Sequence, residues 1–255
     1  MARNPAVTDE QLTRALGIYA GMVGHVLGDP GRWLGVDDDP PPSATFPRRA
    51  ADAVRDRALG KTRPGSREWA AQPLQRRVDW WVTRIGISAG LAAAAPRFAG
   101  ALSDRVPLQA ALGASAAGLA VCATAREHGR TAPADWVPLL AEVLFERKLP
   151  RAADAVPADG EAARRLEASD EDGAAAADDS ADDGGRLAGA QRAARTVWRL
   201  ARALLGVTAL LDERPRGGFL PRVIGKLPVV GVAGGWLDER SGIRKASRET
   251  AALLR

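Results

Sequence analysis

The sequence predicts an all-α protein, a compact bundle of about seven helices interrupted by a disordered acidic insert. Aromatic residues make up only 5% of the 255 residues, and β-branched residues are sparse, so few segments have the composition of a strand. Apolar residues recur at helical spacing in several segments, and alanine supplies much of the 46% hydrophobic content. One acidic stretch lacks the apolar residues that a folded segment buries.

The first helix is predicted to begin at a capping box of Thr8 and Gln11, with Val7 and Leu12 as the accompanying hydrophobic staple. Its apolar residues are spaced four and three apart in a single stripe: Leu12, Leu16, Tyr19, Val23 and Val26. The Gly-Asp-Pro-Gly run at 28–31 ends this helix, and the proline-rich segment 37–42 is expected to be a loop. We expect the stripe to pack against the bundle.

Further helices are predicted over 47–59, from Ser66 to about Ile85, and over 133–145. The segment 106–125, twenty residues without a charge, is long enough for a membrane span. Alanine, glycine and serine dominate it and give little insertion energy, so we expect a central buried helix. Arg126 and His128 suit its last turn, and Gly129 the left-handed residue beyond it.

An acidic insert is predicted over 156–185. Between residues 169 and 185 there are seven acidic residues and no basic one, among alanine, glycine and serine. Such a segment has too little apolar surface to offset the entropy lost on ordering. The insert therefore separates an N-terminal helical part, 1–155, from a C-terminal part, 186–255, of the same domain.

A two-faced helix is predicted from 187 to 211. One face is apolar: Val197, Leu200, Leu204, Val207 and Leu211. The opposite face is an arginine row: Arg192, Arg195, Arg199 and Arg202. Such a helix suits an anionic membrane surface, with Trp198 near the boundary, and a solvated basic face is the alternative. Nucleic acid is not expected, because the tryptophans are scattered through helices rather than set along a basic platform.

No catalytic residue, metal or cofactor is predicted. The single cysteine, Cys122, excludes a disulfide and fits a reducing compartment, and His25 and His128 suit helix ends. The Gly-Lys-Thr at 60–62 lacks the spacing of a phosphate-binding loop, and the glycines at 231–235 lack that of a dinucleotide site. The N-terminus has no continuous apolar stretch, so we expect a cytoplasmic protein.

The C-terminal run 227–238, Leu-Pro-Val-Val-Gly-Val-Ala-Gly-Gly-Trp-Leu-Asp, leads into a basic helix that holds Arg244. Upstream, the apolar segment 86–91 precedes a long alanine-rich helix that ends before Gly129. Together these features resemble the EcsC family, over residues 75–150 and 190–252. In this chain Asp238 stands where the family usually has asparagine. We expect three glycines of the run to allow close helix packing: Gly231, Gly234 and Gly235.

The resemblance implies a helical bacterial protein, often membrane-associated, with a link to ABC transporters. The prediction is thus a non-enzymatic cytoplasmic accessory protein that binds a membrane surface, or a membrane-protein partner, at the inner face of the cell membrane. The sequence predicts no oligomeric state. Two alternatives stay open. One is an integral membrane hairpin over 85–125, and the other is an enzyme with a pocket near the glycine-rich turn that uses Asp238 or Glu239.

Overall fold

The computed structural model describes residues 8–34, 64–94, 105–168, 192–202, 204 and 235–255. Every regular element in these ranges is a helix, which confirms the predicted all-α bundle. The helices are α1 (Asp9–Gly28), α2 (Pro30–Leu34), α4 (Arg67–Ala70), α5 (Leu74–Ala94), α6 (Arg105–Glu127), α7 (Pro133–Phe145), α8 (Asp159–Ala168) and α11 (Gly235–Leu253). Residues 192–202 form a further helical segment. The helix expected over 47–59 and the loop at 37–42 lie outside the described residues.

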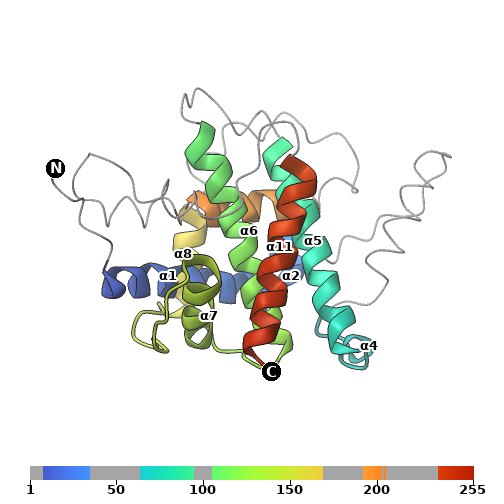
Figure 1. The fold of residues 1–255 in the computed structure, drawn as a ribbon, viewed down its shortest axis with the longest axis horizontal. Coiled ribbons are helices and arrows are strands. Elements are labelled where there is room, and N and C mark those ends of the chain that lie inside the picture. The colour runs from blue at the N-terminus through green and yellow to red at the C-terminus, as the bar shows by residue number, and fades with distance from the viewer. Residues whose placement is uncertain (1–7, 35–63, 95–104, 169–191, 203, 205–234) are drawn as a thin grey trace.

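Three helices, α5, α6 and α11, lie side by side and form the central layer (Figure 1). α5 runs antiparallel to α6, whereas α11 runs in the same direction as α6 and packs against both. The described core of α6 consists mainly of small residues, and Ala116, Leu119 and Ala120 are fully buried. Small side chains let neighbouring helices approach closely. The prediction of a central buried helix is confirmed.

The first helix, α1, runs across this layer in Figure 1 and packs against α6, α7 and α8. Thr8 and Gln11 form the predicted capping box. The Thr8 hydroxyl accepts from the backbone N–H of Gln11 at 3.2 Å, and the Gln11 side-chain Oε1 accepts from the backbone N–H of Thr8 at 3.0 Å. All five residues of the predicted apolar stripe are buried. Val7, the other half of the predicted staple, lies outside the described residues.

The helix predicted from Ser66 to Ile85 is two helices. Ser66 caps the short α4, and its hydroxyl accepts from the Trp69 amide at 3.0 Å. Pro73 then precedes α5, which continues past Ile85 to Ala94. Proline disfavours helical geometry in the residue before it, so the chain breaks at this position and restarts.

Helix α8 corrects the predicted extent of the disordered insert. Residues 156–168 were expected to lack order, yet α8 packs on α1 with Ala162 and Leu166 fully buried. Two exposed polar contacts join it to α1 and α2: His25 Nδ1 lies 3.0 Å from Asp159 Oδ1, and Arg32 NH2 lies 3.3 Å from Glu167 Oε1. The average composition of 156–185 hides this short apolar pair spaced by one helical turn. Residues 169–185 lie outside the described residues.

The predictions about the end of α6, the turn after it and the span of α7 are confirmed. His128 Nδ1 lies 2.8 Å from the Thr124 carbonyl oxygen, and the Arg126 guanidinium donates to the carbonyl of Leu27. Gly129 has the predicted left-handed conformation, with φ of +85°. Helix α7 spans the predicted residues, Pro133–Phe145.

Candidate functional site

The predicted arginine row lies on the helical segment 192–202. Its members, Arg192, Arg195, Arg199 and Arg202, are all half buried, and every other residue from 193 to 201 is buried. The apolar stripe is confirmed through Leu204, while Val207 and Leu211 lie outside the described residues. The four arginine side chains are therefore partly covered by the rest of the bundle.

Contacts with α2 explain part of this cover. The Arg199 guanidinium carbon lies 5.6 Å from the ring centroid of Trp33, which is a cation–π distance. The Thr196 hydroxyl donates to the Trp33 carbonyl at 2.6 Å. Arg192 and Arg202 also make further interactions within the protein. These contacts give the row a role in packing helices together.

Trp198 does not lie at the boundary that the sequence predicted for it. Its exposed fraction is 7%, so the indole belongs to the core. The helical wheel places Trp198 between the apolar and basic faces, but neighbouring helices cover that intermediate sector. An interfacial role for Trp198 is therefore wrong.

Helix α11 carries a more accessible basic face. Ile243, Ala246, Ser247 and Thr250 are buried against the bundle. On the other side Arg244, Lys245 and Arg248 are exposed, and Glu249 Oε1 lies 3.8 Å from Lys245 Nζ. The sequence contained this signal, because the buried residues are spaced three and four apart. The same helix begins at Gly235, whereas Gly231 and Gly234 lie outside the described residues.

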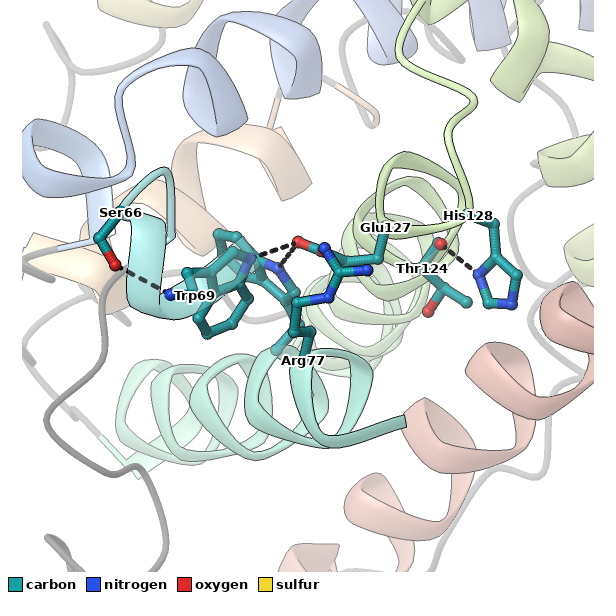
Figure 2. A network of polar contacts seen from close by, with 7 residues as sticks. Ser66, Trp69, Arg77, Thr124, Glu127 and His128 are labelled. Atoms are coloured by element: carbon teal, nitrogen blue, oxygen red, sulfur yellow. Dashed lines mark hydrogen bonds and ion pairs between the residues drawn. The ribbon is translucent and has the colours of Figure 1, made fainter. Parts of the chain in front are cut away.

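A buried polar network joins the end of α6 to α4 and α5 (Figure 2). Glu127 Oε1 accepts from the indole nitrogens of Trp81, at 2.8 Å, and Trp69, at 3.3 Å. Its Oε2 lies 3.1 Å from Arg77 NH1, and the Glu127 side chain is only 8% exposed. Trp69, Trp80 and Trp81 meet edge to face, which fills the space beside the carboxylate with aromatic rings. The network therefore has the features of a structural clamp.

Sequence reasoning missed the Glu127 network. Glu127 directly follows the helix that was expected to be buried, and its indole partners lie 46 and 58 residues earlier in the chain. Nothing local to Glu127 indicates those partners. The one available signal was a carboxylate at the end of a helix whose residues from 111 to 125, apart from Gly113, are buried.

A second buried link joins α6 to α11. The hydroxyl oxygens of Thr124 and Ser247 lie 2.8 Å apart, and both residues are buried. This bond fixes the register between the two helices, because each hydroxyl satisfies the other away from water. The basic face of α11 is therefore held in a defined position.

Two weakly acidic side chains, the phenol of Tyr19 and the thiol of Cys122, are buried in the core between α1 and α6 and stay protonated. Burial raises the pKa of Cys122 well above its usual 9.0, and burial and the nearby Cys122 raise the pKa of Tyr19 well above 10.0. The Tyr19 hydroxyl donates to the Ser115 carbonyl at 2.6 Å. A thiol kept neutral in this way is a poor nucleophile.

Stability is expected to fall as the pH rises above 9.0, the usual pKa of the thiol. The unfolded chain releases these protons at a pH where the folded chain still holds them, so deprotonation favours unfolding. The stabilisation from these two groups is fully present below the pKa values that they have in the unfolded chain. It is lost as the pH rises through their higher pKa values in the folded protein. Urea unfolding over roughly pH 8 to 11 measures it. The double variant Tyr19→Phe, Cys122→Ala should flatten the fall, and an unchanged slope would contradict the assignment.

Neither histidine belongs to a catalytic or metal arrangement in the part of the chain that the structure describes. His25 pairs with Asp159, and His128 with its own helix. The described residues hold no group of three or more potential metal ligands. The side chains of Asp238 and Glu239 lie outside the described residues, so the enzyme alternative stays a prediction.

Comparison with known proteins adds no family to this picture. No family model, curated protein or solved structure matches the chain. The resemblance to the EcsC family therefore stays a prediction. Among the helices that the structure describes, including α5 and α6 of the hairpin alternative, none has the length and apolarity needed to cross a membrane.

Proposed function

We propose that this protein is a non-enzymatic accessory protein that binds an anionic membrane surface through helix α11. The observation that carries the proposal is the exposed basic face of Arg244, Lys245 and Arg248, opposite a buried face of the same helix. A helix fixed to a bundle presents its charges without the entropy cost of folding at the membrane.

The charge distribution supports the same proposal. Residues 186–255 contain 14 basic and 5 acidic residues, a net charge of +9, while the whole chain carries +5. The positive charge is thus concentrated in the C-terminal part. Each basic residue near an anionic bilayer contributes about 1 kcal/mol to binding. The resemblance to the EcsC family favours the same setting, at the inner face of the cell membrane.

The basic face of α11 fits this role better than the arginine row does. The row is half buried, and Arg199 contacts Trp33. Moving these guanidiniums to lipid headgroups would break packing contacts, whereas the side chains on α11 are exposed. In the proposal the row contributes long-range charge and α11 makes the contact.

The variant Arg244→Gln, Lys245→Gln, Arg248→Gln is expected to bind phosphatidylglycerol-rich vesicles about 100-fold more weakly than the parent protein, because it loses three favourable charges. Co-sedimentation over a range of lipid concentrations measures the change. Rising salt should weaken the parent in the same assay, since it screens exposed charges.

A matched control removes three exposed charges elsewhere: Arg14→Gln, Lys148→Gln, Arg164→Gln. It has the same net charge as the α11 variant, so equal loss in both would show a nonspecific effect of total charge. A parent protein that ignores anionic vesicles at low salt would overturn the proposed function.

A further inference from the structure

We infer that the protein docks end-on and tilted toward the basic face of α11, so that the end of the molecule built from α4, the start of α5 and the end of α11 enters the lipid interface beside that face. Leu74 and Leu253 are the apolar anchors of this docking end. The inference rests on the proposed function and adds the orientation and the residues that enter the acyl region.

The fold brings these two leucines to the same end. Leu74 is the first residue of α5 and Leu253 the last of α11, and the two helices run antiparallel (Figure 1). Glu127, at the end of α6, accepts from Trp69 on α4. The end of α6 is therefore beside α4 and the start of α5, and α11 lies along α6 with its C-terminus at the same end.

The exposed large apolar side chains of the described ranges lie at this end. Within the described ranges, the large hydrophobic side chains that are exposed are Leu74, at 37%, and Leu253, at 44%. One exposed leucine on a protein surface is ordinary. Here the two lie at the ends of adjacent helices, at the same end of the molecule, while the other large apolar side chains in these ranges are buried or partly buried.

Exposed basic side chains outnumber exposed carboxylates on the elements at this end. Exposed arginines at this end are Arg67, Arg76, Arg130, Arg248 and Arg255. The exposed carboxylates there are fewer: Glu68, Asp79 and Glu249. Asp79 accepts from the Gln75 amide, and Glu249 neighbours Lys245. Exposed leucines at an end with an excess of arginine suit the boundary between acyl chains and anionic headgroups.

The small number of exposed large apolar side chains favours lipid over a protein partner. A stable protein interface needs on the order of 1,000 Å² of complementary surface with a continuous apolar centre. Two separate leucine tips do not form such a centre. A bilayer has no fixed shape to match, so separate anchors can each insert and the charges between them can contact headgroups.

A fluorescent probe tests the depth of insertion. Cys122 is fully buried, so a cysteine introduced by Leu253→Cys can be labelled selectively with the environment-sensitive dye NBD. On phosphatidylglycerol-rich vesicles we expect its emission to brighten about twofold or more and shift to the blue. The same label at Glu10→Cys, exposed at the start of α1 and away from α4 in Figure 1, should stay unchanged.

A second variant makes the test independent of labelling. Leu74→Ser, Leu253→Ser should weaken vesicle binding roughly tenfold, because the partly exposed leucines lose apolar burial in the membrane. Both positions are exposed, so folding is retained. The control Ala153→Ser, Ala158→Ser changes two exposed residues that precede α8 and should bind like the parent.

The outcomes separate the two proposals. If the parent binds anionic vesicles but the label at position 253 reports water and the serine variant binds normally, end-on docking is overturned and the proposed function stands. If the parent binds only vesicles that contain a membrane protein, lipid anchoring is overturned. If it binds no anionic vesicle, both proposals fall.

Discussion

Replacing Glu127 with alanine is expected to cost about 3 kcal/mol of the free energy of unfolding, because removing one partner of a buried ion pair leaves the other charge uncompensated. The Glu127 carboxylate is 8% exposed and accepts from two indoles while it pairs with Arg77. Arg77 Nε is already buried and has no hydrogen-bond partner among the residues that the structure describes. Without Glu127, the guanidinium and both indole N–H groups lose their acceptor.

Urea unfolding of the parent and of Glu127→Ala measures this loss, with Glu68→Ala as the control. Glu68 is an exposed carboxylate on α4, so its removal should change stability by less than about 0.5 kcal/mol. A second substitution sharpens the test. Arg77→Met introduced into Glu127→Ala should recover part of the loss, because it removes the unpaired buried charge. Additive losses in the double variant would contradict the assigned pairing.

The Glu127 clamp also bears on membrane binding. It fixes α4 and the start of α5 against the end of α6, and those elements form most of the proposed docking end. A loosened clamp would let α4 move and change the spacing of Arg67 and Leu74 relative to α11. Variants of Glu127 are therefore unsuitable as controls in vesicle assays.

Local patterns in the sequence were sufficient to predict most of the helices. The capping box at Thr8, the stripe of α1 and the limits of α7 depend on residues within one or two turns of each other. The uncharged segment 106–125 was predicted as a buried helix for the same reason. Such features need no knowledge of the neighbours, and the structure confirms them.

The misplaced features depend on contacts between distant residues or on short elements. Helix α8 packs through two buried residues, Ala162 and Leu166. Two apolar residues in an acidic segment are too few to predict a helix from the sequence. Burial of Trp198 depends on neighbouring helices and not on its own helix. The choice between the arginine row and α11 as the exposed basic surface likewise follows from which face the bundle covers.

Three glycines of α1 lie where other parts of the chain approach the helix closely, and the sequence alone does not predict these contacts. Gly17, Gly21 and Gly24 are spaced four and three apart, so they lie on one face of the helix. A side chain added at Gly21 would meet the Pro157 ring at 2.9 Å, and one at Gly24 the Pro133 ring at 2.8 Å. Glycine is needed on this face because the chain before α8 and the start of α7 pack directly against the α1 backbone.

Gly17→Ala is therefore expected to destabilise the protein by about 3 kcal/mol, the upper part of the usual range for overpacking. A Cβ at this position would lie 2.4 Å from the carbonyl oxygen of Ala155 and 2.6 Å from its carbonyl carbon. Those atoms are backbone, so a rotamer change cannot relieve the clash. Either α1 or the segment before α8 must shift, and both carry buried core residues.

Gly28→Ala is the matched control, because Gly28 lies on the same helix and a Cβ there would meet nothing within 4 Å. Alanine has the higher helix propensity, so this variant should be neutral or more stable by up to about 1 kcal/mol. The two substitutions make the same chemical change and are expected to have opposite signs in urea unfolding. Equal stability of the two variants would show that α1 does not pack closely at Gly17, and the assigned position of the chain before α8 would then be wrong.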